Sequence, residues 1–201
     1  MTVDLSKFLR SRRSIRRFLP DPIPQSVIEE IIETATYAPS AHDKQPWRFV
    51  VISSEETKSK LFTAITNKFR LDMLKDKAPV EEIDKRIERT IRRTREARFI
   101  IIMCQDISQV EPQPDKIRQN LEMTMGIQSV AVAGLQLLLA AHAEGLGATW
   151  ICWPLFTANE ICVALDLPTT WTPQEMIFLG YPDEDPAPSP RKPLQEIVRY
   201  L

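Results

Sequence analysis

Glycine is scarce in this chain, and the first half of the sequence has none. Only five of the 201 residues are glycine, and none of them precedes Gly126. The first half therefore holds neither the GxGxxG fingerprint of dinucleotide-binding folds nor a P-loop. A nucleotide phosphate bound there would have to be held by side chains, because no glycine-rich backbone is available to cradle it.

Cysteine and histidine are also few, which argues against several kinds of chemistry. The three cysteines form no CxxC pair and are typical of free thiols in a reducing cytoplasm. The two histidines, His42 and His142, have no partner at metal-ligand spacing, so a zinc site is not expected. Ser40, His42 and Asp43 lie on one short segment, and such near neighbours seldom reach the geometry of a catalytic triad. The cysteines are Cys104, Cys152 and Cys162.

Neither charge nor hydrophobicity is concentrated enough to indicate a nucleic-acid or membrane partner. The chain has 26 Lys and Arg against 27 Asp and Glu, a net charge of -1 that gives no bulk attraction to anionic polymers or lipids. The N-terminal residues lack the apolar segment of a signal peptide. The longest apolar stretch, 127–143, contains polar residues and is shorter than the roughly 20 residues that span a bilayer. We therefore expect a cytoplasmic protein.

The length and the apolar periodicity together predict the organisation of the chain. A chain of 201 residues with 43% hydrophobic content is expected to form a single domain over 1–201. Helical spacing predicts helices over 26–38, 56–69, 80–98, 116–144 and 158–165, the first starting with a capping box of Ser26 and Glu29. Apolar runs predict strands over 48–53, 99–103, 148–153 and 175–179. Their alternation with helices favours a mixed sheet packed by helices.

Three of these segments suggest more than local structure. The helix over 116–144 is apolar or small on nearly all sides from Met123 onward, so we expect it to be buried against a second copy and predict a homodimer. The helix over 80–98 carries a narrow stripe of Ile83, Ile87 and Ile91 amid charged residues, which suits a surface helix lying over a pocket. The tail over 182–201 holds five prolines and is either disordered or an extended arm.

Four segments could carry chemistry. Arg12-Arg13-Ser14-Ile15-Arg16-Arg17 offers guanidinium forks and a hydroxyl suited to phosphate, although a solvated basic loop or a nucleic-acid patch has the same composition. The loop from Ala38 to Trp47 is framed by two prolines and is either a ligand loop or part of the core. At Pro154-Leu155-Phe156, free backbone N–H groups could face a ligand. The fourth segment, Pro190-Arg191-Lys192-Pro193, is a basic pair on the tail.

Taken in this order, the segments resemble the nitroreductase family of FMN enzymes. The matching stretches are RRSIRRF, APSAHDKQPWRFVVI, IQSVAVAGLQLLLAAHAEGLGATWICWPLF, LGYP and RKPL. Within the family the chain looks closest to the flavin-reductase domain fused to coenzyme F420 glutamate ligases. The resemblance implies an α+β fold and an intertwined homodimer with a long central interface helix. It also implies two FMN sites at the interface between the subunits.

The resemblance also assigns roles to individual residues. Arg12 and Ser14 match positions that bind the FMN phosphate and ribityl chain, and Arg191 matches a further phosphate-binding position. Arg16 matches the basic residue beside flavin N1 and O2, where a fixed cation stabilises reduced flavin. Ser40 and position 43 match residues that the other subunit lends to the ring. The backbone N–H of Leu155 or Phe156 would approach flavin N5. The full set assigned to FMN is Arg12, Arg13, Ser14, Arg16, Pro39, Ser40, Ala41, Asp43, Gln45, Pro154, Leu155, Phe156 and Arg191.

Asp43 departs from the family pattern, which usually has asparagine at this position. A carboxylate cannot donate the amide hydrogen bond, and its charge would oppose anionic reduced flavin unless it is protonated or paired. Lys44 is the candidate partner. The flavin potential, and with it the identity of the acceptor, therefore depends on the state of Asp43.

The expected activity is an FMN-dependent oxidoreductase with a ping-pong cycle. NAD(P)H would give hydride to FMN, and a small electron-poor acceptor such as a nitroaromatic or a quinone would then take the electrons. No side chain is assigned as a general acid. The alternatives are reduction of a dehydro side chain on a deazaflavin precursor, a non-catalytic flavin-binding protein, and a nucleic-acid-binding protein.

Overall fold

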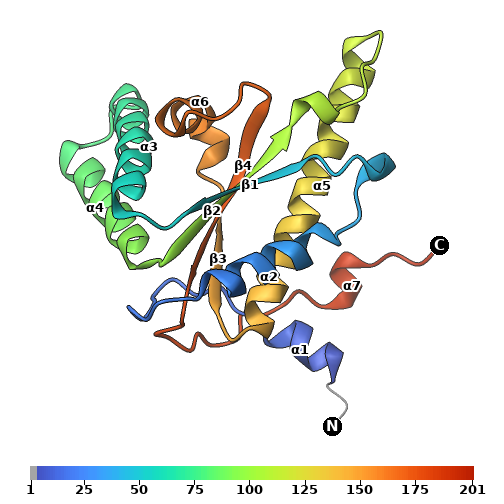
Figure 1. Ribbon diagram of the computed structural model, residues 1–201, viewed down its shortest axis with the longest axis horizontal. Helices are drawn as coiled ribbons and strands as arrows, with labels where there is room; N and C mark the ends of the chain where they lie inside the picture. Colours follow the sequence, from blue (N-terminus) through green and yellow to red (C-terminus); the bar gives the residue numbers. More distant parts are fainter. Residues whose placement is uncertain (1–3) are drawn as a thin grey trace.

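A four-stranded antiparallel sheet forms the centre of the computed structural model, which describes residues 4–201 without the side chains of 93–95 (Figure 1). The strands are β1 (Trp47–Ile52), β2 (Phe99–Asp106), β3 (Gly147–Ile151) and β4 (Trp171–Gly180), in the order β1-β2-β4-β3. Every pairing between these strands is antiparallel. The parallel part of the expected mixed sheet is one isolated bridge between Ser14 and Ala148, at the β3 edge.

Helices cover both faces of this sheet. They are α1 (Leu5–Ser11), α2 (Gln25–Thr36), α3 (Glu55–Lys75), α4 (Val80–Glu96), α5 (Lys116–Ala143), α6 (Pro154–Leu165) and the single turn α7 (Leu194–Ile197). Short 3-10 turns stand at Ala41–Asp43 (η1) and Ile107–Gln109 (η2). Figure 1 shows α2 and α5 on one side of the sheet, and α3, α4 and α6 on the other.

The central strand β2 shows why both faces are buried. Successive side chains of a strand point to opposite faces, so Ile101 and Met103 join the core under α2 and α5. Ile100, Ile102 and Cys104 join the core under α3 and α6. Because neither face meets water, β2 reads in the sequence as a continuous apolar run rather than as an alternating one.

Helix α5 is long and apolar enough to cross a membrane by length and composition alone, and no other helix within 4–201 is. The sequence prediction rested only on the apolar stretch 127–143, which is too short to span a bilayer, whereas the whole helix begins at Lys116 and is long enough. Its small side chains let the helix pack across the sheet and against α2, as a core helix does. The buried residues of α5 are Gly126, Ser129, Val130, Ala133, Gly134, Leu137, Leu138, Ala140 and Ala141.

Several predicted boundaries are wrong for identifiable reasons. The capping box does not form, because α2 starts at Gln25 after Pro24 and no side chain caps it. Glu29 instead accepts a hydrogen bond from Gln25 Nε2 at 2.7 Å. Helix α6 starts four residues earlier than expected, at Pro154, since proline is well suited to the first helical turn. Helix α1 was not predicted, because it buries no residue and so leaves no apolar period.

The tail is an extended arm over its first residues. Pro182 bridges to Phe18, and the Asp183 N–H donates to the Arg17 carbonyl at 3.0 Å. Beyond this point the arm is largely exposed and includes α7 before the C-terminus (Figure 1). The tail thereby returns to the N-terminal arginine segment.

Candidate functional site

The arginine segment between α1 and α2 lies along the edge strand β3. Ser14 bridges to Ala148, and the Ile15 N–H donates to the Ala148 carbonyl at 3.0 Å. Ile15 is buried in the core, whereas Ser14 is only half-buried and Arg16 is exposed. The alternation of an extended backbone therefore turns Ser14 and Arg16 away from the core.

Arg12 and Arg191, from opposite ends of the chain, lie close to each other here, and Arg13 lies beside Arg12. Burial lowers the pKa of Arg12, and the positive charges of Arg13 and Arg191 lower it further. None of these three guanidinium groups forms an ion pair with a carboxylate among the residues that the structure describes. Like charges gathered without a counter-ion form a site suited to a bound anion.

The three arginines are not equally available to a ligand. Arg13 Nη1 donates to the carbonyls of Arg10, Ser11 and Arg12 at 2.7, 3.1 and 2.9 Å, and so closes the C-terminal end of α1. Arg191 Nη1 donates only to the carbonyls just before it, at 3.0 and 3.2 Å. The predicted role of Arg12 and Arg191 suits this geometry, while Arg13 already has a structural role.

A cavity of about 240 Å³ adjoins Arg12 and holds His142 in its wall. His142 Nε2 lies 2.8 Å from Ser11 Oγ, and its ring stacks on Phe8 with 5.0 Å between centroids. Burial lowers the pKa of His142, and the charges of Arg12 and Arg13 lower it further. The imidazole therefore favours its neutral form beside the arginines.

Glu184 fixes the backbone of the arginine segment, a role that the sequence did not suggest. One carboxylate oxygen accepts hydrogen bonds from the N–H groups of Arg16 and Arg17 at 2.5 and 3.3 Å. The other pairs with Arg17 Nε at 3.3 Å. Burial opposes ionisation of Glu184, but these bonds and the charge of Arg17 hold its pKa below the ordinary value. Arg16 keeps its guanidinium exposed, with one long bond to the Ser14 carbonyl.

The loop over 39–45 is held in an unusual backbone conformation. His42, Asp43 and Gln45 have φ of 54°, 51° and 48°, in the left-handed region that few residues other than glycine adopt. Ser40 Oγ accepts a hydrogen bond from the Gln45 N–H at 3.0 Å, and the Ala41 N–H donates to Ser129 Oγ of α5 at 3.1 Å. Such strain persists only where the surroundings fix it, and it is common at ligand-binding loops.

The expected pairing of Asp43 with Lys44 is wrong. Lys44 Nζ lies 2.7 Å from Glu111 Oε2, because the left-handed turn directs it to the loop before α5. Asp43 instead accepts a hydrogen bond from Gln45 Nε2 at 3.0 Å. Its charge is therefore not balanced by the neighbouring lysine.

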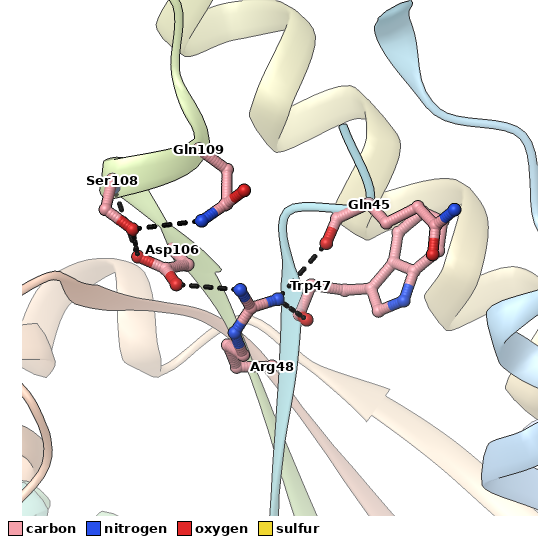
Figure 2. A network of polar contacts seen from close by, with 6 residues as sticks. All are labelled: Gln45, Trp47, Arg48, Asp106, Ser108 and Gln109. Atoms are coloured by element: carbon pink, nitrogen blue, oxygen red, sulfur yellow. Dashed lines mark hydrogen bonds and ion pairs between the residues drawn. The ribbon is translucent and has the colours of Figure 1, made fainter. Parts of the chain in front are cut away.

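An ion pair anchors the end of this loop to the sheet. Figure 2 shows the Arg48 guanidinium between the Asp106 carboxylate and the carbonyls of Gln45 and Trp47. The Arg48–Asp106 distance is 2.9 Å. Burial opposes ionisation of Asp106, but hydrogen bonds from Ser108 and the charge of Arg48 hold its pKa below the ordinary value. Trp47 itself is buried, which makes it a core residue rather than a ligand contact.

One chain does not bring all of the predicted site residues together. The loop over 39–45 contacts α5 at Ser129, whereas the arginine segment contacts α5 at His142 through Ser11. At a rise of 1.5 Å per residue these points are about 20 Å apart along the helix. Figure 1 shows η1 and α1 well separated along α5.

The third segment follows β3 directly. Pro154 is buried, whereas Leu155 and Phe156 are 58% and 69% exposed. The sequence predicted free N–H groups here, but both are hydrogen-bonded. The Leu155 N–H donates to the Cys152 carbonyl at 3.3 Å, and the Phe156 N–H donates to the Trp153 carbonyl at 2.9 Å. The longer Leu155 bond makes this N–H the easier one to redirect to a ligand.

The arginine segment and the edge of β3 together suit an elongated anionic ligand. The edge strand β3 (Gly147–Ile151) has 5 residues and is roughly 16 Å long, with Ser14 bridged near its start and the segment from Pro154 to Phe156 after its end. Within the described residues no group of three or more His, Cys, Asp or Glu side chains is placed to hold a metal ion. Burial raises the pKa of Cys104 to about 12, so this thiol is no nucleophile at neutral pH.

Comparison with known proteins supports the nitroreductase family but not the narrower resemblance to the domain fused to F420 glutamate ligases. The nitroreductase family model matches residues 9–181. The chain is 31% identical over 195 residues to YfhC of Bacillus subtilis, named as an NAD(P)H nitroreductase, covering 96% of this chain and 91% of that protein.

Solved structures share the fold. A BluB-like flavoprotein from Clostridium difficile superposes with a TM-score of 0.81 at 23% identity, over 100% of both chains. A Desulfovibrio desulfuricans protein described as a nitroreductase in complex with FMN gives a TM-score of 0.76 at 24% identity, over 100% of this chain and 98% of that one. From the family match and the similarity to YfhC, the chain belongs to the nitroreductase family.

Proposed function

We propose that the protein is an FMN-dependent oxidoreductase that takes hydride from NAD(P)H and reduces a small electron-poor organic molecule. The observation that carries this proposal is the group of Arg12, Arg13 and Arg191, gathered without a carboxylate partner among the described residues. A phosphate monoester supplies the missing negative charge. Membership of the nitroreductase family and the name of the Bacillus subtilis relative support the same reading.

The residues present suit the phosphate, the ribityl chain and one edge of the ring of FMN. Arg12, Ser14 and Arg191 would hold the phosphate and ribityl end, which explains how the chain can dispense with a glycine-rich loop. Arg16 has an exposed guanidinium and a backbone fixed by Glu184, so it would present a cation to the electron-rich edge of the ring. When bound, FMN supplies hydride chemistry at N5 and lets donor and acceptor react in turn.

A second copy of the chain would complete the site. The loop over 39–45 and the arginine segment lie about 20 Å apart along α5, so we infer that Ser40 and Asp43 serve the site of the partner. Exposed apolar side chains on α5 and α7 support this arrangement, because a lone chain would leave them in water. They are Ile117, Leu121, Ile127, Val132 and Leu135 on α5, and Leu194 and Ile197 on α7.

Flavin content tests the proposal directly. Arg12→Ala should lose most of its FMN, measured as the ratio of flavin to protein absorbance after gel filtration. Arg10→Ala is the matched control, since it removes a nearby charge outside the cavity and should stay loaded. An Arg12→Ala protein with undiminished FMN would refute the phosphate site. Salt-sensitive DNA binding by a colourless wild-type protein would favour the nucleic-acid alternative.

The acceptor and the location are the finer parts of the proposal. Reduction of a deazaflavin precursor would use the same FMN site and would differ only in the molecule that meets the flavin. The three cysteines are free in the structure, which agrees with a cytoplasmic location.

A further inference from the structure

A second cavity, of about 430 Å³, lies where α3, α4 and the start of α6 meet. It is the pocket that the isoleucine stripe of α4 predicted, and Ile87 lines it. Its volume falls within the range of pockets that enclose small organic ligands. Its lining also includes Phe69, Asp72, Arg86, Arg89, Trp153 and Phe156.

Three aromatic side chains, Phe69, Trp153 and Phe156, form part of its wall. Phe69 and Trp153 meet edge to face, with 5.9 Å between ring centroids and 86° between planes. Phe156 leaves 69% of its surface exposed, although it sits beside this cavity. An exposed phenyl ring next to an aromatic wall offers a stacking surface for a planar ring.

The charges at the cavity are not balanced. Asp72 is paired with Lys68 on its own helix at 2.5 Å, and Arg86 is paired with Glu82 at 2.5 Å. Arg89 has no such partner among the residues that the structure describes. The first turn of α6 also borders the cavity, and the N-terminal end of a helix carries partial positive charge. The uncompensated charge is therefore positive.

We propose that this cavity receives the electron acceptor and that Arg89 selects acceptors whose planar ring carries an acidic group, such as an aromatic carboxylate. The inference rests on the proposed function, because Phe156 belongs to the segment that would meet FMN and so puts the cavity next to the flavin. Arg89 would bind the acid while the aromatic wall holds the ring. The phosphates of NADPH offer similar chemistry, so the test must separate acceptor from donor.

Pairs of substrates that differ by one charged group distinguish binding of the acceptor from binding of the NAD(P)H donor. In a ping-pong cycle, kcat/KM for each substrate reports only its own half-reaction. We would measure kcat/KM for 4-nitrobenzoate and 4-nitrobenzamide, and for NADH and NADPH, with flavin-loaded protein. Arg89→Gln should lower the nitrobenzoate-to-nitrobenzamide ratio about tenfold, because a hydrogen bond to a charged group is lost. The NADPH-to-NADH ratio should not change.

A control variant on α4 and a direct binding measurement complete the test. Arg92→Gln removes the same charge from α4 outside the cavity and should leave both ratios unaltered. Calorimetry should show about tenfold weaker binding of 4-nitrobenzoate to Arg89→Gln in the absence of NAD(P)H. Unchanged acceptor ratios in an active flavoprotein overturn this inference alone, as does a loss confined to NADPH. A protein that neither binds FMN nor oxidises NAD(P)H overturns the proposed function instead.

Discussion

The buried carboxyl of Glu175 should make the folded protein lose stability as the pH rises. Glu175 stands opposite Met103 in the sheet and is 3% exposed, beneath α5. Its Oε1 atom has no hydrogen-bond partner among the described residues. Burial raises the pKa of Glu175 from 4.5 to about 8. At neutral pH the carboxyl is therefore mostly protonated in the fold, although it would be ionised in the unfolded chain.

The sign and size of the effect follow from these two pKa values. Between them the folded state binds more protons than the unfolded state, so the free energy of unfolding falls as the pH rises. The loss begins near the ordinary value of 4.5 and is complete above about 8. From about pH 5 to about pH 8.5, ionisation of Glu175 should cost roughly 4 kcal/mol of stability.

Urea unfolding of wild type and Glu175→Gln at those two pH values isolates the stability that is lost when Glu175 ionises. Tryptophan fluorescence at a fixed protein concentration gives the free energy by linear extrapolation. The amide adds a packing and hydrogen-bonding cost that is the same at both pH values, so it cancels in the difference. The wild type should lose about 4 kcal/mol more than the variant. Glu30→Gln, which changes an exposed carboxyl on α2, should behave like wild type. Equal losses, within about 1 kcal/mol, in wild type and Glu175→Gln would refute the reasoning.

Three further predictions concern the packing of α5 and the loop over 39–45. Gly134→Ala should destabilise the protein by about 1–3 kcal/mol in thermal or urea unfolding, although alanine favours helices, because the new Cβ would lie 2.6 Å from the Trp150 ring. A neutral or stabilising effect would contradict this close approach. Asp106→Asn should lower the free energy of unfolding at neutral pH by about 2 kcal/mol, since ionised Asp106 pairs with Arg48. The variant should also lose less stability than wild type as the pH falls below about 4, and an equal loss in both proteins would count against the ion pair. Asp43→Asn should raise the flavin midpoint potential in a redox titration, because asparagine tolerates the same left-handed backbone and removes only the charge. An unchanged midpoint would mean that Asp43 does not face the ring.

Local and periodic signals made much of the fold predictable. The apolar run of β2 and the small, apolar pattern of α5 depend only on neighbours in the sequence, and both predicted elements are present. The isoleucine stripe of α4 even indicated the cavity, because Ile83 is buried while Ile87 lines it.

Features that depend on distant contacts were not predictable. Lys44 was expected to pair with its neighbour Asp43, yet left-handed turns direct it to Glu111, 67 residues away. Glu184 gave no signal in a proline-rich tail, because its role depends on the tail returning to Arg16. The proximity of Arg191 to Arg12 follows from the resemblance but not from any local pattern in the chain.

The central claim is that this chain carries FMN and passes electrons from NAD(P)H through it. The most direct measurement is the visible absorption spectrum of the purified protein before and after anaerobic addition of NAD(P)H. The account predicts a flavin spectrum that bleaches on addition and returns when a nitroaromatic acceptor is supplied. A colourless protein that takes up no added FMN, or a bound flavin that NAD(P)H does not bleach, would contradict it.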